Sequence, residues 1–288
     1  MSALQHRPGH YDRWVMQARP VPPTGFPFSS PPREEADRWA GAGLAEDQLR
    51  MLAVGAFYTR SNHAFNDTLA FAPEEAGAGT RREKAIGALA DAWRVTSAEE
   101  AAGTMERLLA GMHAPRFAIV HSLAQAGAAA TAAETWTRVP DQHRAFLRQV
   151  AAVHGMDGLD RDYDNWVQAI KFGFLNLLPQ PLSTDATAWD LARLVFLVRA
   201  SHTAGYLDEA TAWKVLARGL AESQRHYRNW RQFGSGFLTG GLFWCCGDLS
   251  EVGVQTRNRL GMIRGLYLRP DSPWRRVALH PEGTPARP

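Results

Sequence analysis

The sequence predicts an all-α protein, a compact multi-helix bundle with an extended proline-rich N-terminal arm and an irregular C-terminal tail. Three observations lead to this class. Apolar residues recur at three- and four-residue spacing through most of the chain, as on one face of a helix. No stretch shows the sustained two-residue alternation, rich in Val, Ile and Thr, that marks strands. Capping side chains and helix-ending glycines separate the periodic segments.

The predicted organisation has three parts: an arm over residues 1–33, one helical domain over 34–270 and a tail over 271–288. The arm contains seven prolines, which fix φ and lack the N–H that a helix needs, so it is expected to be extended. Aromatic side chains alternate with these prolines, which predicts that the arm packs on the domain. A detached linker is the alternative, since chain ends are commonly free.

The first part of the domain is predicted to be helical over 34–39, 45–61, 81–92 and 97–109, with a loop over 62–79. Ser97 and Glu100 have the spacing of a capping box, and Gly111 ends that helix. Further helices are expected over 115–125, 128–136, 141–154 and 166–178. Residues 263–268 fit either a short strand or the end of a helix.

The most informative stretch is 187–246, which predicts three helices in succession. Thr187 caps an amphipathic helix ended by Gly205, Asp208 caps a second amphipathic helix, and Asn229 caps a third. The third helix contains four glycines, each costing about 1 kcal/mol relative to Ala in a helix interior. Close approach of a neighbouring helix is the compensation that we expect. The four are Gly234, Gly236, Gly240 and Gly241.

Several short motifs appear in a fixed order along the chain. They are W-D-x-x-R at 189–193, G-Y-L at 205–207, A-W at 212–213, Y-x-N-W at 227–230 and G-x-x-F-W at 240–244, preceded by L-A-V-G-A at 52–56 and W-R-V-T-S at 93–97 and followed by S-P-W at 272–274. With them the chain resembles the bacterial domain-of-unknown-function family 1266 over residues 44–280, most closely over 187–246. The resemblance implies a helical fold and a bacterial source. It brings no established activity, so no catalytic residue is carried over.

Composition restricts the function classes. A hydrophobic content of 45%, with 10 Trp and 13 Phe, is ample for a core. The net charge is +3, and only Lys84, Lys171 and Lys214 among the 32 cationic residues are lysines. Without a lysine-rich tail or basic run, nucleic-acid binding is unlikely and the arginines reflect a GC-rich genome. No signal peptide or membrane span is predicted.

Two adjacent cysteines, Cys245 and Cys246, lie within a predicted helix, where they are poorly placed to form a disulfide. They predict a reduced, cytoplasmic protein. Neither they nor the scattered histidines form a metal motif, so no metal or other cofactor is predicted.

One polar set on the helix over 188–204 is the candidate pocket: Asp190, Arg193, Arg199, His202 and, in the following turn, Tyr206. In the functional interpretation an arginine binds an anion and His202 moves protons. In the structural interpretation Asp190 pairs with Arg193, and Arg199 pairs with His202, to fix helix packing. We favour the structural interpretation, because buried polar networks are commoner than active sites.

Two other clusters fail as functional motifs. Asp160, Asp162 and Asp164 have the spacing of a calcium loop, but Asn165 and Lys171 stand where that loop needs Gly and Glu. A solvated, capping loop is predicted there instead, together with Asp157. In the segment 225–231, aromatic rings are expected to face the core and arginines the water, rather than to stack on single-stranded nucleic acid.

The leading functional hypothesis is therefore a bacterial cytoplasmic accessory protein that acts through contacts with a protein partner and has no catalytic residues. The alternative is an enzyme of unknown type with an anion-binding Arg/His pocket on helix 188–204, and a weaker alternative is nucleic-acid binding. An enzyme predicts an open pocket with Arg193 or His202 partly exposed. A binding protein predicts an exposed apolar patch instead.

Overall fold

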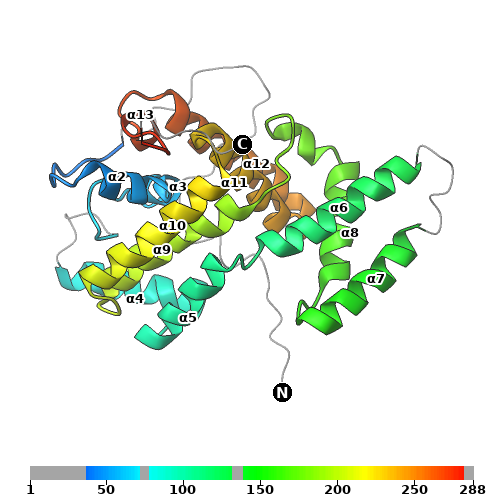
Figure 1. The fold of residues 1–288 in the computed structure, drawn as a ribbon, viewed down its shortest axis with the longest axis horizontal. Helices are drawn as coiled ribbons and strands as arrows, with labels where there is room; N and C mark the ends of the chain where they lie inside the picture. Colours follow the sequence, from blue (N-terminus) through cyan, green and yellow to red (C-terminus); the bar gives the residue numbers. More distant parts are fainter. Residues whose placement is uncertain (1–36, 72–77, 132–138, 282–288) are drawn as a thin grey trace. The chain divides into compact units, whose positions relative to one another are not determined.

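The computed structural model of the protein describes residues 37–71, 78–131 and 139–281 (Figure 1). Within these ranges the protein is all-α, as predicted, and the one extended feature is an isolated bridge between Arg38 and Phe65. The predicted arm over 1–33 lies outside the described residues. The helices are α2 (Glu46–Ala53), α3 (Ala56–Ser61), α4 (Ala78–Trp93), α5 (Ala98–Leu109), α6 (Ala114–Thr131), α7 (Val139–His154), α8 (Leu159–Lys171), the 3₁₀ helix η2 (Phe174–Leu177), α9 (Thr187–Ala204), α10 (Glu209–His226), α11 (Trp230–Cys245), α12 (Leu249–Leu268) and α13 (Pro273–Arg276).

The chain divides into two compact units. Unit 1 comprises Met1–Ala110, Leu191–Phe233 and Gly261–Pro288, and unit 2 comprises Gly111–Asp190 and Gly234–Leu260. The sequence had indicated a single helical domain over 34–270 and gave no sign of this division. Three of its boundaries fall inside α9, α11 and α12, where no linker marks them, and the fourth falls between Ala110 and Gly111, after the end of α5.

In unit 1, α9 is buried on every side from Leu191 to Ser201. Its Phe196 contacts the rings of Tyr58, Phe71 and Trp93, which come from three different segments. The prediction of an amphipathic helix is therefore wrong here. The polar residues that gave α9 two faces in the sequence are themselves buried, and a helix surrounded by others needs no water-facing side.

The predicted helix over 45–61 is split into α2 and α3 at Val54 and Gly55. A Cβ on Gly55 would lie 2.4 Å from the Cγ1 of Val195, so only glycine allows the chain to approach α9 this closely. The helix predicted over 34–39 is not found in its described part, since residues 37–39 lie outside any helix.

Most predicted caps are present. The Asp208 carboxylate accepts the N–H of Thr211 at 2.6 Å, and the Asn229 side chain accepts the N–H of Gln232 at 3.0 Å. Ser97 accepts the N–H of Glu100 at 3.2 Å, but the Glu100 carboxylate accepts from the N–H of Thr96 instead of closing the box on Ser97. The first residues of α5, α10 and α11 are therefore determined by capping side chains close by in the sequence.

Unit 2 contains α6, α7 and α8, which pack on one another. Its core includes Phe117, Trp166 and Phe243, whose rings meet edge to face at 5.4–5.6 Å. Two helices predicted over 115–125 and 128–136 are one helix, α6, as far as Thr131; residues 132–136 lie outside the described ranges.

The predicted helix over 166–178 is also displaced. α8 begins seven residues earlier, after Gly158 with φ of 82°, and is followed by η2 after Gly173 with φ of 74°. Residues 263–268, which fitted a strand or a helix end, form the end of α12.

Two of the four glycines of α11, Gly240 and Gly241, allow close packing within unit 2, as expected. A Cβ on Gly240 would lie 2.5 Å from the Cβ of Trp189, and one on Gly241 would lie 3.1 Å from the Cδ of Arg259. The helix-propensity cost of these glycines is therefore offset by contacts that a side chain would prevent.

The tail is attached to unit 1 by Trp274, which lies in the short helix α13. Its indole stacks on Trp230 at 5.3 Å between ring centroids, and its Nε1 donates to the carbonyl oxygen of Ala53 at 2.8 Å. The rest of the described tail is irregular, as predicted.

Candidate functional site

Asp190, the first member of the predicted pocket, is fully buried in unit 2. Its carboxylate accepts the backbone N–H groups of His113 at 2.8 Å and Ala114 at 3.0 Å, and contacts His113 Nδ1 at 2.5 Å. These N–H groups open α6, so Asp190 satisfies donors that a helix start leaves free. The edge of the His113 ring in turn meets Trp244 at 4.5 Å. His113 lies 77 residues away in sequence, and sequence reasoning did not find it.

The two arginines of the predicted pocket are buried in unit 1. The Arg193 guanidinium carbon lies 4.5 Å from the centroid of the Trp93 ring, in cation–π geometry. Arg199 donates to Thr59 Oγ1 at 2.6 Å and to the carbonyl oxygens of Phe65 and Ala70 at 2.8 and 2.9 Å. Arg199 therefore holds the loop that follows α3 against α9.

Burial has a measurable consequence for Arg199. Removal of its charge from water lowers the pKa of the Arg199 guanidinium to about 10, an effect that the nearby Asp67 carboxylate partly opposes. Asp67 itself accepts three successive backbone N–H groups, those of Ala40, Gly41 and Ala42, at 2.7–3.0 Å. Both side chains are thus committed to ordering backbone.

His202 and Tyr206 lie in the turn between α9 and α10. Both are partly exposed, and His202 Nδ1 lies 3.2 Å from the carbonyl oxygen of Leu207. The contacts of the five predicted residues therefore lead to different partners, with Asp190 assigned to unit 2 and the others to unit 1. An anion pocket formed by these residues stays a prediction.

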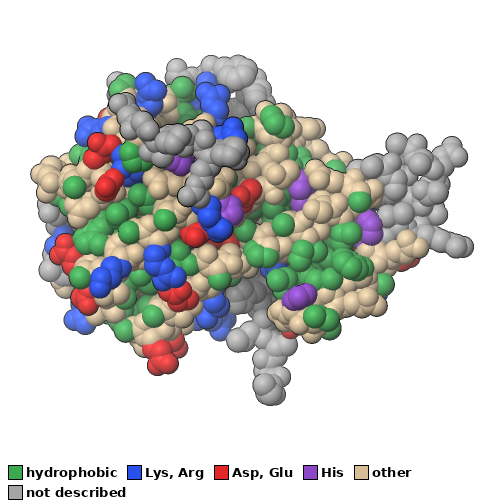
Figure 2. Space-filling view, viewed as in Figure 1, with side chains coloured by type: hydrophobic (Ala, Val, Ile, Leu, Met, Phe, Trp, Pro, Cys, Tyr) green, Lys and Arg blue, Asp and Glu red, His purple; other side chains and the backbone are tan. Residues whose placement is uncertain are grey.

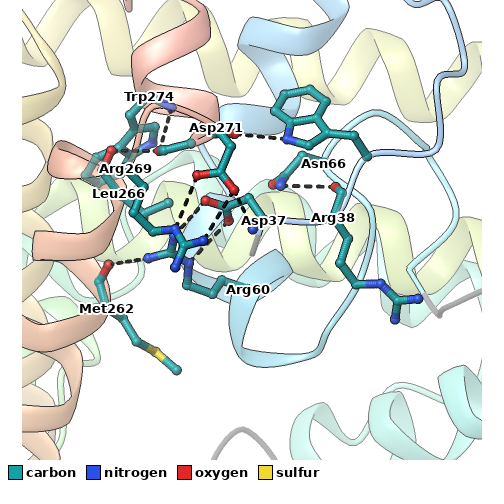
Figure 3. Close-up of polar contacts among 11 residues, drawn as sticks. Asp37, Arg38, Arg60, Asn66, Met262, Leu266, Arg269, Asp271 and Trp274 are labelled. Atoms are coloured by element: carbon teal, nitrogen blue, oxygen red, sulfur yellow. Dashed lines mark hydrogen bonds and ion pairs between the residues drawn. The ribbon is translucent and has the colours of Figure 1, made fainter. Parts of the chain in front are cut away.

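Unit 1 contains a further polar cluster that the sequence did not reveal (Figure 3). Arg60 donates through two nitrogens to the Asp37 carboxylate, at 3.2 and 2.6 Å, and through a third to the carbonyl oxygen of Met262 at 3.1 Å. The Asp271 carboxylate accepts the Asp37 N–H at 3.1 Å, and its backbone oxygen accepts Trp39 Nε1 at 2.9 Å. A buried bidentate pair of this kind fixes geometry, and here it joins the first and last described segments of unit 1.

In unit 2 the acidic residues near 160 belong to α8 and form ion pairs with arginines. Asp162 pairs with Arg116 of α6 at 2.5 Å, and Asp164 and Asp160 pair with Arg144 and Arg148 of α7 at 2.9 and 3.5 Å. The prediction of a solvated loop is therefore wrong for Asp160, Asp162 and Asp164, which lie in a helix, near whose start negative charge is favoured, whereas Asp157 lies exposed in the turn before it. In the part of the chain that the structure describes, no group of three or more His, Cys, Asp or Glu side chains is placed to hold a metal ion.

These ion pairs determine which side of α7 carries charged residues. Both arginines of α7 reach towards α8, and Leu147 and Ala151 are buried. Six exposed residues remain on the opposite side, spaced so that they share one helical face, and none is charged. We call this set the α7 face: Gln142, Ala145, Phe146, Gln149, Ala152 and Val153. Phe146 is 49% exposed and Val153 is 77% exposed.

The adjoining helix α6 has the same character. Its exposed described residues after Arg116 are small or uncharged, namely Ala118, Ser122, Gln125 and Ala126. Figure 2 shows apolar, uncharged and histidine side chains over α6 to α8, with few acidic or basic ones among them.

A second apolar feature follows α8. Phe172 is 65% exposed and is followed by Gly173, whose left-handed backbone turns the chain. The Phe172 ring lies 6.4 Å from that of Phe174, and Phe174 packs beside Gly253 of α12, where a Cβ would lie 3.2 Å from the ring. Among the described residues, the large hydrophobic side chains that are exposed are Phe146, Val153, Phe172, Leu249 and Val254 in unit 2 and Leu268 in unit 1.

These observations define an all-α protein of two compact units, with its buried charges tied to backbone, aromatic rings and each other, and with exposed apolar side chains mostly in unit 2. Residues 88–279, more than half of the chain, match the family described as protein of unknown function (DUF1266), and the chain belongs to that family. The motifs at 189–244 and 272–274 lie inside the matched range, and that at 52–56 lies before it.

No curated protein and no solved structure matches the chain. None of the described helices combines the length and the apolar character that crossing a bilayer requires. Function must therefore be argued from the surface and contacts described above.

Proposed function

We propose that this protein is an accessory protein that acts through protein–protein contacts, and that unit 2 carries the binding surface. The observation that carries the proposal is the uncharged α7 face, with Phe146 and Val153 exposed on it. Helical faces that remain in water are normally polar and charged. Contiguous exposed apolar surface marks interaction sites, because covering it releases about 25 cal/mol per Å².

The arrangement of charge around α7 supports the same role. Arg144 pairs with Asp164 of α8 and with Asp141 of α7, and Arg148, whose side chain is 60% exposed, reaches Asp160 of α8. These arginines border the α7 face and are not part of it, so its own residues carry no charge that would have to lose water on binding. Aromatic side chains at the centre of such a surface commonly contribute most of the binding energy. Phe146 on α7 and Phe172 after α8 are the two exposed aromatic side chains that we propose in this role.

The contacts of the polar residues favour this proposal over an enzyme. Arg199 is fully buried and donates to a hydroxyl and two carbonyl oxygens, and Asp190 is fully buried against a helix start. Neither side chain is exposed to a substrate. The proposal places the protein in the bacterial cytoplasm, a reducing compartment that suits the two buried free thiols of Cys245 and Cys246.

The test compares partners recovered by four versions of the tagged full-length chain from native cytoplasm, measured by quantitative mass spectrometry. The versions are the wild type, Phe146→Glu, Phe172→Glu and a control, Leu268→Glu. The exposed fraction of Leu268, 64%, is close to that of Phe172, 65%, but Leu268 belongs to unit 1. We expect specific partners to be retained by the control and lost with Phe146→Glu or Phe172→Glu, while thermal melting shows that all four are folded.

Two outcomes would overturn the proposal. One is recovery of the same proteins with all four versions. The other is recovery of background only, together with a metabolite that raises the melting temperature of the wild type, which would favour the enzyme alternative.

A further inference from the structure

We infer that unit 1 carries a basic surface that binds the phosphate backbone of duplex nucleic acid. The basic surface consists of Arg228, Arg231 and Arg275, which lie just before α11, in the first turn of α11 and in α13. The inference goes beyond the proposed function, because it concerns unit 1 and does not involve the α7 face.

The positive charge of unit 1 is concentrated in two segments. Residues 225–233 and 261–281 contain seven arginines and one acidic residue, Asp271, whereas the net charge of the whole chain is only +3. Both segments belong to unit 1. The sequence did not favour nucleic-acid binding, because these arginines form no continuous basic run. The basic surface arises only where the fold brings the two segments together.

Aromatic side chains hold the two segments against each other. The rings of Trp230 and Trp274 stack with 5.3 Å between their centroids and 3° between their planes. The hydroxyl of Tyr267 donates to the carbonyl oxygen of Arg231 at 3.1 Å. Arg231 directly follows Trp230 and Arg275 directly follows Trp274, so the stacked rings bring the stretches of chain that carry these arginines close together.

The acidic side chains near these segments are already bound by other arginines: Glu222 by Arg225, Asp271 by Arg269 (Figure 3), and Glu46 and Asp47 by Arg50, which also donates to the carbonyl oxygen of Ala278. Within the described part of the chain, no ion pair involves Arg228, Arg231 or Arg275, and all three residues are exposed. The start of α11 adds the positive end of a helix dipole to their charge. Three positive charges are therefore available to an anionic partner.

The make-up of the surface favours nucleic acid over an acidic protein. Interfaces between proteins have aromatic or apolar side chains at their centre. Here Tyr227, Trp230 and Trp274 are buried, and among the described residues of unit 1 the one exposed large hydrophobic side chain is Leu268. Interfaces with DNA are more polar and much more positively charged, and a guanidinium group can donate to two phosphate oxygens at once.

The burial of the same rings favours a duplex over a single strand. Proteins that bind single strands stack the bases on exposed aromatic side chains. The rings of Trp230 and Trp274 are stacked on each other instead. We therefore expect contacts to phosphates and not to bases, and binding that does not depend on sequence.

The first measurement is the fluorescence anisotropy of a labelled DNA duplex of about 20 base pairs, titrated with the full chain. Non-specific binding of this kind has a Kd of roughly 1–100 µM near physiological salt. Three phosphate contacts predict that the logarithm of the association constant falls with the logarithm of salt concentration with a slope of about −2.7. Affinity should therefore decrease roughly fortyfold between about 50 and 200 mM sodium chloride.

The second measurement compares two variants that lose the same charge. One removes the basic surface and the other removes three exposed cations from α4, α5 and the first half of α10 in unit 1. The first is Arg228→Gln, Arg231→Gln, Arg275→Gln, and the second is Lys84→Gln, Arg107→Gln, Lys214→Gln. At about 50 mM salt the first should bind at least about tenfold more weakly than the wild type and lose most of the salt dependence. The second should stay within about twofold of the wild type, with thermal melting showing that both are folded.

A wild type that does not bind the duplex at low salt overturns the inference, and so does equal weakening of the two variants, which would mean that net charge alone causes binding. Tighter binding of a single strand than of the duplex also contradicts it. If polyglutamate or phosphatidylglycerol vesicles bind in its place, and the first variant loses that binding, the partner is an acidic protein or a membrane. Phe146→Glu should bind the duplex as the wild type does, so failure of the proposed function leaves this result unchanged.

Discussion

The two units use arginine in different ways. On the outside of unit 1, Arg218 of α10 pairs with Glu106 of α5 at 2.5 and 2.9 Å, and both side chains are more than half exposed. In unit 2, Arg116 and Asp162 are mostly buried, and the arginines of α7 also reach towards α8. Both pairs join neighbouring helices, but the Arg218 pair lies largely in water and the Arg116 pair largely out of it. The arginines of α7 reach towards α8, and none of the residues of the α7 face is charged.

Each unit also contains a buried charge, and the two charges have different hydrogen-bond partners. Unit 1 surrounds Arg199 with a hydroxyl and two carbonyl oxygens, and unit 2 surrounds Asp190 with two N–H groups and a histidine. Asp190 accepts from donors, and Arg199 donates through Nη1 and Nη2 to acceptors, as burial favours, although the buried Nε of Arg199 has no hydrogen-bond partner. The two units therefore differ in the charge on their surfaces, and both surround their buried charges with hydrogen-bond partners.

The largest expected effect contrasts a tryptophan of each unit. Trp166 in unit 2 is fully buried among Phe117, His121 and Phe243, so Trp166→Ala should reduce the free energy of unfolding by about 3–5 kcal/mol through the cavity it leaves. Trp213 in unit 1 is partly exposed and donates to Glu209 at 3.1 Å. Its replacement by Ala should cost less than about 1 kcal/mol.

Urea unfolding followed by circular dichroism measures both variants. Equal losses would show that the Trp213 face of α10 is as buried as the core of unit 2. Apolar spacing in the sequence predicts Trp213 on the core-facing side of this helix with Leu216 and Leu220, whereas the structure leaves Trp213 partly exposed.

An intermediate effect tests the two uses of arginine directly. Arg116→Gln should reduce stability by about 1–3 kcal/mol, because it removes a partly buried pair with Asp162 and a bond to the carbonyl oxygen of Asp157. Arg218→Gln should cost at most about 1 kcal/mol, since exposed pairs gain little. The hydrogen bonds from Arg218 lower the pKa of Glu106, but both side chains lie in water, where such a pair is weak.

The salt dependence of the same two variants provides the control. Sodium chloride should reduce the contribution of Arg218 more than that of Arg116, because the first pair is open to counterions. Equal costs and equal salt responses would remove the distinction drawn between the units.

Local chemistry explains what the sequence could predict. The bounds of α9, α10 and α11 follow from apolar spacing and from the caps at Asp208 and Asn229, which lie within a few residues of the groups they bond. Gly240 and Gly241 of α11 were correctly expected to pack closely, since their propensity cost needs an offset. Capping residues and the spacing of apolar residues are both local in sequence, and together they were sufficient to predict these three helices.

Long-range contacts explain what it could not. The break at Gly55 depends on Val195, and the role of Asp190 depends on His113, both distant in sequence. The aspartates of α8 resembled a loop because their arginine partners lie on α6 and α7. The α7 face was missed for the same reason: its lack of charge is visible only when the neighbouring arginines are known to point elsewhere.

The smallest effect concerns the interior of unit 2. His121 is buried, its ring stacks on Phe117 at 4.9 Å, and its Nδ1 accepts from Trp166 Nε1 at 3.3 Å. Burial lowers the pKa of His121 below its usual value, so the unfolded chain takes up a proton at a higher pH than the folded chain. This contribution to stability is complete above about pH 6.5 and falls as the pH decreases below it.

Urea unfolding at pH 8, 6 and 5 should therefore show a loss of stability that is larger for the wild type than for His121→Gln, with a difference that grows as the pH falls. His143, whose pKa burial also lowers, is present in both proteins and cancels in the difference. Parallel pH profiles would mean that His121 exchanges protons as freely as in the unfolded chain. The core of unit 2 would then be open to water, and the contrast between its sealed interior and its exposed apolar face would be lost.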